Sequence, residues 1–349
     1  MKNALRLVGS LIAAAALAGA ATAQDVRVLG RNDVVPGAGF TAQWPGSGFE
    51  ATFEGKTLKA TIYDWGANWL NVEIDGVTTQ LALGVGQQTY TLFDGAAGSH
   101  AIRVTRRTGA NVGPTRFLSI EADGLKPTKA PDHRILVIGD SYASGYGVEG
   151  ADEKCTYSYE TQNAGLAYPA LLGGTFGADV HVVAMDGGGL TRNYAGDGPT
   201  MSTLAWQTLP TGDTAWAALS YQPQVIVVNL GTNDFDASDP GQAFDDAYVF
   251  LLRRLRVAYP DALIIGSAGG SLWGKRYTAE KTSISDAIAF VEKEGDKNVR
   301  FIEFKLKPGP GRYGCDYHLG KRAQAEAAAA LDQEISKSLG WQPMAKSAE

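Results

Sequence analysis

The sequence predicts a two-domain protein in which an N-terminal β-sandwich, residues 24–128, precedes an α/β domain with a parallel sheet, residues 129–349. Two observations predict this organisation. The first is that the N-terminal part alternates apolar with polar residues along short runs, whereas the C-terminal part alternates apolar runs with helical stretches. The second is the segment between them, where Pro127, Lys129 and Pro131 indicate a linker.

The N-terminal strands are predicted from a period of two. Apolar and polar side chains alternate over residues 49–54, as expected where one face of a strand is buried. Residues 70–74 repeat the pattern and end in an Asp-Gly turn. Further strand-like runs, bounded by turns that contain Gly or Asp, cover residues 89–92, 101–105 and 116–121. Many short strands at this spacing favour a sandwich.

The C-terminal strands are predicted from apolar runs rich in β-branched residues, which are typical of strands buried on both faces. These runs cover residues 135–138, 180–184, 225–228, 263–266 and 299–304. Helical stretches lie between them, most clearly at 242–255, and a last helix is predicted over about 321–339. Strands that alternate with helices predict a parallel sheet covered on both faces, with its functional groups at the carboxyl ends of the strands.

The first 23 residues have the features of a secretory signal peptide. Lys2 and Arg6 make the start positive, a short apolar stretch follows, and Ala-Thr-Ala at 21–23 fits a cleavage site. The apolar stretch is too short to span a bilayer comfortably, and no later segment is long enough. We therefore expect a soluble protein, either secreted or periplasmic, without a membrane partner. The formal net charge of −6 and the lack of a basic block argue against nucleic acid as a partner.

Cys155 and Cys315 are the two cysteines of the chain. An even number in an exported protein favours one disulfide, with two buried free thiols as the alternative. Two cysteines without a histidine cluster lack the ligand spacing of a metal site, so no metal is expected.

Three polar motifs follow three of the predicted C-terminal strands. Gly-Asp-Ser-Tyr at 139–142 places Ser141 at a strand-to-helix turn, exposed and beside backbone N–H groups that can receive an oxyanion. Three glycines at 187–189 let further backbone N–H groups approach a substrate closely. In Gly-Thr-Asn-Asp at 231–234, the Asn233 amide can donate to developing negative charge. The motifs together predict a nucleophilic serine with its oxyanion donors.

A serine nucleophile needs a base within hydrogen-bond reach, and the chain has four histidines. His100 falls in the N-terminal domain, His133 in the linker and His181 inside a predicted strand. His318 alone sits in a loop at the expected edge of the sheet, just before the last helix. Taken singly, each motif could be an ordinary turn, loop or helix cap. Their order and placement favour catalysis.

These blocks resemble those of the SGNH, or GDSL-like, hydrolases, and the chain after residue 23 resembles carbohydrate esterase family 2. Further stretches carry the resemblance: Trp-Pro-Gly-Ser-Gly (44–48), Arg-Arg-Thr (106–108), Gly-Tyr-Gly-Val-Glu-Gly (145–150), Arg-Asn-Tyr (192–194) and Gly-Cys-Asp-Tyr-His (314–318). The resemblance implies a jelly-roll-like sandwich joined to a flavodoxin-like α/β/α SGNH-hydrolase domain. It also implies deacetylation of plant cell-wall polysaccharides such as xylan and glucomannan, with no metal or organic cofactor.

The resemblance assigns a role to each matching residue. Ser141 is the nucleophile, and its own backbone N–H is one oxyanion donor. Gly187 supplies a second backbone donor and the Asn233 side chain a third. His318 is the general base, and then the acid that protonates the leaving sugar hydroxyl.

One departure from the superfamily pattern concerns the residue that orients the histidine. The superfamily places an aspartate three residues before the histidine, and here that position is Cys315. Members of the resembling family often orient the ring by a backbone carbonyl, so we favour a Ser–His dyad, with Asp316 as orienter the alternative. A Cys155–Cys315 bridge would pin this loop to the segment after the nucleophile.

Substrate binding is the part of the function that the sequence leaves most open. Trp273, after the fourth predicted parallel strand, is a candidate sugar-facing aromatic, with a packed loop tryptophan as the equal alternative. The N-terminal domain could bind glycan or wall the cleft, and we favour the wall. The expected partner is an acetylated polysaccharide or oligosaccharide. The rivals are another acyl substrate, such as peptidoglycan O-acetyl or a short-chain ester, and a non-catalytic glycan-binding protein.

Overall fold

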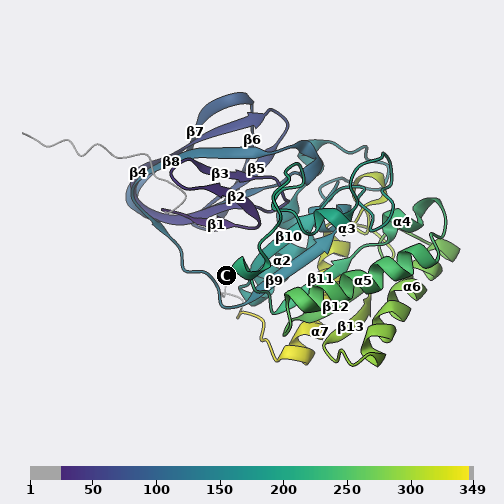
Figure 1. The fold of residues 1–349 in the computed structure, drawn as a ribbon. Coiled ribbons are helices and arrows are strands. Elements are labelled where there is room, and N and C mark those ends of the chain that lie inside the picture. Colours follow the sequence, from purple (N-terminus) through teal and green to yellow (C-terminus); the bar gives the residue numbers. More distant parts are fainter. Residues whose placement is uncertain (1–24, 346–349) are drawn as a thin grey trace, which may run out of the picture.

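The computed structural model describes residues 25–345, so the predicted signal peptide, residues 1–23, lies outside the described residues. An antiparallel sheet domain lies beside an α/β domain whose parallel sheet is flanked by helices (Figure 1). The predicted fold class is thereby confirmed. Among residues 25–345, no helix combines the length and apolar character needed to cross a membrane.

The N-terminal strands form an antiparallel sheet in the order β2-β3-β8-β4-β7-β5-β6, with β1 paired to β4. Their bounds are β1 Arg27–Leu29, β2 Asn32–Val35, β3 Gly39–Ala42, β4 Gly48–Trp65, β5 Trp69–Ile74, β6 Val77–Ala82, β7 Val85–Arg106 and β8 Thr115–Pro127. The alternating residues of β4 behave as the period predicts: Phe49, Ala51 and Phe53 are buried, and Phe49 packs edge-on against Phe117. A short 3₁₀ turn, η1 Ala110–Val112, connects β7 to β8.

The strand prediction at 89–92 and 101–105 differs from the structure in one respect. Both runs belong to the single strand β7, which pairs with β4 along its whole length. The Gly- and Asp-rich stretch between them makes no turn. Its register shifts, because Gly98 pairs with Gly55 while Asp94 pairs with Thr57. The extra residues are therefore absorbed as a bulge, which bends a strand without ending it.

The C-terminal strands form a parallel sheet in the order β10-β9-β11-β12-β13. The bounds are β9 Arg134–Gly139, β10 Asp179–Ala184, β11 Val225–Asn229, β12 Leu263–Ala268 and β13 Val299–Glu303. Ile135 and Val137 face a core with helices α2 Tyr168–Phe176 and α7 Lys321–Leu339. Leu136 and Ile138 face the other core, with α5 Gln242–Ala258 and α6 Gly274–Lys293. Both faces are covered, as the apolar runs predict.

The strand order places the three predicted motifs side by side. The chain passes from β9 to β10 on one side, then crosses to β11 on the other, so the carboxyl ends of these three strands adjoin. A crevice forms at such a switch point in an open parallel sheet. Short elements complete the domain: α1 Ser141–Ser144, α3 Met201–Leu204, α4 Thr232–Ala237, η2 Tyr159–Thr161, η3 Ala164–Leu166, η4 Ala218–Ser220 and η5 Cys315–Tyr317.

The two domains share buried residues at their interface. Trp44, from the N-terminal domain, is fully buried in a core of the α/β domain, and its indole N–H donates to the Thr208 carbonyl at 2.8 Å. Arg31 donates to the carbonyls of Ala205 and Gln207 at 2.8 and 2.9 Å. Buried polar groups satisfied across an interface hold one geometry, because separation would leave them unpaired. The N-terminal domain is therefore integrated into the α/β domain.

Trp44→Ala tests this integration. We expect the free energy of unfolding to fall by about 3–5 kcal/mol, because a buried indole is lost and a cavity remains. Trp65 is 61% exposed, so Trp65→Ala should change the free energy of unfolding by less than about 0.5 kcal/mol. Chemical denaturation followed by circular dichroism measures both. Equal stability of the two variants would contradict the shared core.

Candidate active site

The turn that carries Ser141, the predicted nucleophile, is built by Asp140 and the single helical turn α1. Asp140 caps α1, since its Oδ1 accepts the Tyr142 backbone N–H at 3.0 Å. Ser141 follows β9 and lines a cleft of about 700 Å³. The sequence predicts an exposed serine, yet Ser141 is 5% exposed, because the walls of the cleft, His318 among them, crowd it.

His318 reaches the serine from the loop before α7. Its Nε2 lies 2.9 Å from the Ser141 Oγ, and its Nδ1 lies 3.0 Å from the backbone carbonyl oxygen of Asp316. A carbonyl only accepts hydrogen bonds, so in the neutral ring Nδ1 carries the proton and donates. Nε2 then presents its lone pair to the serine hydroxyl. The ring is held in the tautomer that a general base requires.

The backbone around Asp316 is what turns that carbonyl toward the ring. Asp316 and Tyr317 have φ angles of 51° and 59°, in the left-handed region that few non-glycine residues adopt. Among the described residues, the hydrogen bonds of the Asp316 carboxylate go to groups other than the imidazole. Its Oδ2 accepts from the Tyr146 hydroxyl and the Tyr157 backbone N–H, both at 3.2 Å. The structure thus supplies the orienting acceptor from the backbone, as in the favoured dyad.

A disulfide joins Cys155 to Cys315, which confirms the predicted pairing. Backbone hydrogen bonds accompany it, because the Cys315 N–H donates to the Gly147 carbonyl and the Asp316 N–H to the Cys155 carbonyl. Gly150 packs so closely that a Cβ there would lie 2.4 Å from the Cys315 Sγ. The glycines after the nucleophile therefore let the two loops meet.

Aromatic rings surround the histidine. The Tyr146 ring lies 4.1 Å from the His318 ring, measured between centroids, and stacks on Tyr157 at 3.9 Å. Burial among these groups disfavours the charged imidazolium and lowers the pKa of His318 to about 4, although the Asp316 backbone opposes this shift. His318 is therefore neutral, and able to act as a base, across the neutral range.

Gly187 and Asn233 line the same cleft beside Ser141. Gly187 follows β10 with a φ of 74°, a conformation that suits glycine. Asn233 lies on α4, and its Nδ2 donates to the Gly188 carbonyl at 2.9 Å and to Asp140 Oδ2 at 3.2 Å. These acceptors fix the amide plane. An oxyanion bound here would compete with the longer of the two bonds, the one to Asp140.

Buried carboxylates beneath the cleft hold its loops. Asp234 accepts the backbone N–H groups of Leu190, Thr191 and Arg192 at 2.7 to 3.0 Å, and so fixes the glycine-rich loop. Burial, together with other nearby carboxylates, raises the pKa of Asp140 to about 7. In the sequence, Asp234 belongs to the motif 231–234, which taken singly could be only a helix cap. Its loop-anchoring role depends on contacts with residues more than forty positions away.

Trp273 lies at the rim of the cleft, where β12 leads into α6. Its side chain is 57% exposed, and its ring centroid lies 6.2 Å from that of Tyr317, which also lines the cleft. Arg276 also lines the cleft, and its guanidinium carbon lies 5.9 Å from the centre of the Trp273 ring. The remaining histidines serve elsewhere: His100 pairs with Asp75, His133 stacks on Trp341 and His181 stacks on Tyr221.

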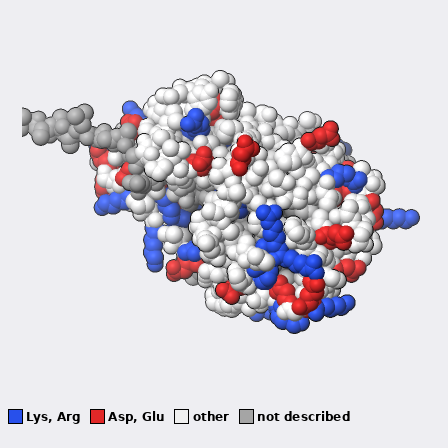
Figure 2. Space-filling model, in the orientation of Figure 1, with Lys and Arg blue, Asp and Glu red and all other residues white. Residues whose placement is uncertain are grey.

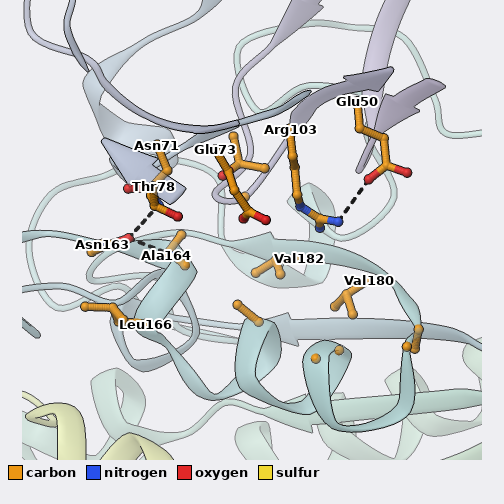
Figure 3. A pocket seen from close by; sticks show the side chains of 18 of the residues that line it. Glu50, Asn71, Glu73, Thr78, Arg103, Asn163, Ala164, Leu166, Val180 and Val182 are labelled. Carbon is orange, nitrogen blue, oxygen red and sulfur yellow. Dashed lines mark hydrogen bonds and ion pairs between the residues drawn. The ribbon is translucent and has the colours of Figure 1, made fainter. Parts of the chain in front are cut away.

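A second hollow, of about 570 Å³, lies between the domains (Figure 3). Its upper wall carries Glu50, Glu73 and Arg103 of the N-terminal domain, and Val180 and Val182 of β10 line the opposite side. Arg103 is paired with Glu50 across 3.0 Å. Neither Ser141 nor His318 lines this hollow. Within residues 25–345, no cluster of three or more His, Cys, Asp or Glu is placed to hold a metal ion.

Two family models match the chain. Residues 137–326 match the GDSL-like Lipase/Acylhydrolase family, which defines the C-terminal domain as an acylhydrolase. Residues 28–131 match the model described as Carbohydrate esterase 2 N-terminal. With both matches in sequence order, the chain belongs to carbohydrate esterase family 2, as the resemblance predicts, and is a carboxylic ester hydrolase.

Named relatives and solved structures agree with this membership. The chain is 33% identical over 290 residues to Cellulase/esterase CelE of Acetivibrio thermocellus, covering 81% of this chain and 36% of that protein's length. It is 26% identical to an Acetylxylan esterase / glucomannan deacetylase of Cellvibrio japonicus, covering 92% of this chain and 91% of the relative. A family two carbohydrate esterase from Clostridium thermocellum, solved in complex with cellohexaose, superimposes with a TM-score of 0.87 at 32% identity, covering 90% of this chain and 99% of that one.

The pKa of His318 sets the pH dependence that we expect. We expect neutral His318 to act as the base, so kcat/KM should stay level from neutral pH downward and fall as the ring protonates near pH 4. Acetate release from a soluble acetyl ester measures this, with samples returned to pH 7 to show that the loss is reversible. An acid limb near the ordinary value of 6.5 would contradict the buried ring.

Proposed function

We propose that this esterase is exported and removes O-acetyl groups from plant cell-wall polysaccharides such as xylan and glucomannan. Ser141 is the nucleophile and His318 the base. The observation that carries the proposal is the 2.9 Å contact between Ser141 Oγ and His318 Nε2, on a ring whose other nitrogen donates to a carbonyl. This geometry activates the serine hydroxyl as a nucleophile, and a site that only binds glycan does not need an activated nucleophile.

In acylation, Ser141 Oγ attacks the acetyl carbonyl carbon while His318 Nε2 takes the hydroxyl proton. The tetrahedral oxyanion is bound by the backbone N–H groups of Ser141 and Gly187 and by the Asn233 amide. Each such donor is typically worth ~3 kcal/mol to the transition state. The C–O bond to the sugar then breaks, and His318 gives its proton to the departing sugar oxygen. The acetyl group stays on Ser141.

In deacylation, a water takes the place of the sugar. His318 Nε2 accepts a proton from this water as its oxygen attacks the acetyl carbon. The same donors stabilise the second oxyanion. The bond to Ser141 Oγ breaks, the proton returns to the serine, and acetate leaves. The Asp316 carbonyl keeps the ring in place and stabilises the transient imidazolium, without itself taking a proton.

The substrate class is supported by the relatives and by the surface. A relative that matches along nearly its whole length is named Acetylxylan esterase / glucomannan deacetylase, and a similar esterase structure contains cellohexaose. Figure 2 shows charges of both signs scattered over a mostly uncharged face, which suits a neutral polymer. Export is supported by the disulfide, and by a start that has the composition of a signal peptide. We retain 24–128 and 129–349 as the proposed domains.

Ser141→Ala tests the reaction. Wild-type protein should release acetate from acetylated xylan or glucomannan, and Ser141→Ala should lose at least about 10³-fold in kcat because the nucleophile is gone. Ser285→Ala, on α6, serves as a matched control with full activity. If Ser141→Ala kept wild-type rates, the mechanism would fail. If acetate were released faster from O-acetylated peptidoglycan than from xylan, peptidoglycan would instead be the substrate.

Trp273→Ala tests the sugar-facing rim. We expect KM for acetylated xylan to rise about tenfold, because an exposed aromatic face that packs on a sugar ring is lost. For 4-nitrophenyl acetate, which is too small to reach the rim, kcat/KM should stay within about twofold. Phe250, 64% exposed on α5, provides the control substitution Phe250→Ala. An unchanged KM for the polymer would assign Trp273 to loop packing alone.

A further inference from the structure

The loop that carries Gly187 is held from outside its own domain. Asn111, in the η1 turn of the N-terminal domain, lines the active-site cleft. Its Oδ1 accepts the Asp186 backbone N–H at 2.9 Å, and its Nδ2 donates to the Asp186 carbonyl at 3.0 Å. One side-chain amide therefore satisfies both backbone groups of the residue before Gly187.

The bond to the Asp186 carbonyl controls a catalytic group. That carbonyl and the Gly187 N–H belong to the same planar peptide, in which C=O and N–H point in opposite directions. Holding the carbonyl against Asn111 therefore directs the Gly187 N–H away from Asn111. A hydrogen bond to the carbonyl also polarises the peptide, which makes its N–H a stronger donor.

The position of Asn111 is itself fixed by burial. Its neighbour Ala110 is fully buried in a core of the α/β domain, and the Ala110 carbonyl accepts from Gln43 Nε2 at 3.0 Å. Gly109 packs so tightly that a Cβ there would lie 2.2 Å from Asp186 Oδ2. The segment 109–111 therefore contacts Asp186 on its carboxylate side as well as its backbone.

The Asp186 side chain connects this contact to the nucleophile. Its Oδ1 accepts from the Ser144 hydroxyl, and its Oδ2 accepts from Gln162 Nε2 at 3.0 Å. Ser144 ends α1, the turn that Ser141 begins, and the Ser144 hydroxyl also contacts the Ser141 carbonyl at 3.0 Å. One residue thus joins the N-terminal domain, the oxyanion loop and the nucleophile turn.

We propose that Asn111 is a positioning residue for the oxyanion donor Gly187, so that the N-terminal domain completes the catalytic centre of the α/β domain. The inference rests on the proposed roles of Ser141 and Gly187. It assigns the N-terminal domain a part in the chemical step, beyond walling the cleft or holding glycan.

Asn111→Ala tests the proposal. We expect kcat on 4-nitrophenyl acetate to fall about tenfold, less than the ~100-fold loss typical when an oxyanion donor is removed outright. KM should stay within about twofold, because the substrate carbonyl gains this contact only as charge develops. Inactivation by a methylphosphonate ester, which forms a tetrahedral adduct on the serine, should slow in parallel with kcat. If Asn111 had only a structural role, the inactivation rate would not fall in proportion to kcat.

Two further variants keep the test decisive. Asn111→Asp has nearly the same shape and can accept the Asp186 N–H, but it cannot donate to the carbonyl, so we expect kcat to fall at least as far as with alanine. Asp179→Asn removes the ion pair between the domains at Arg27, at the other end of β10, and should keep wild-type kcat. Wild-type kcat and inactivation rates in both Asn111 variants, or an equal loss in Asp179→Asn, would overturn the proposal. Activity in Ser141→Ala would instead refute the proposed function.

Discussion

The proposed catalytic centre depends on the hydrogen bond that His318 donates from Nδ1 to the Asp316 carbonyl. It decides which nitrogen carries the proton, and hence that the lone pair of Nε2 faces the serine. To make this bond, the backbone at Asp316 and Tyr317 adopts the left-handed region. The surrounding contacts hold that conformation: a disulfide on one side, and Tyr146 with the Tyr157 N–H on the carboxylate of Asp316. A backbone acceptor replaces the acidic side chain that many serine hydrolases use.

Three carboxylates near Ser141 hold the surrounding loops by hydrogen bonds. Asp140, Asp186 and Asp234 each stand next in the chain to Ser141, Gly187 or Asn233, and each accepts hydrogen bonds that fix loops. Burial disfavours charge at two of them: it raises the pKa of Asp140 to about 7 and also raises the pKa of Asp186. Preorganised donors stabilise an oxyanion because they need not reorient during the reaction. These carboxylates supply that rigidity to the donors around Ser141.

Much of the fold and part of the site could be predicted from the sequence. The parallel strands lie where apolar β-branched runs occur, because a strand buried on both faces is apolar along its whole length and is therefore easy to identify. Residues 321–339 form the last helix as predicted. The bulged strand β7 could not be predicted, since its Gly- and Asp-rich stretch has the composition of a turn. Asn111 carried no signal at all, because its partner, Asp186, is seventy-five residues away.

By itself, the sequence determined the domain order, the strands that end in the glycine, serine and asparagine motifs, and the choice of His318 among four histidines. Local composition and period carry that information, because they reflect which face of each element is buried. Only the tertiary structure decided which atom orients His318 and which domain holds the oxyanion loop. Both depend on contacts between segments distant in the chain, and on backbone angles at Asp316 and Gly187 that packing imposes.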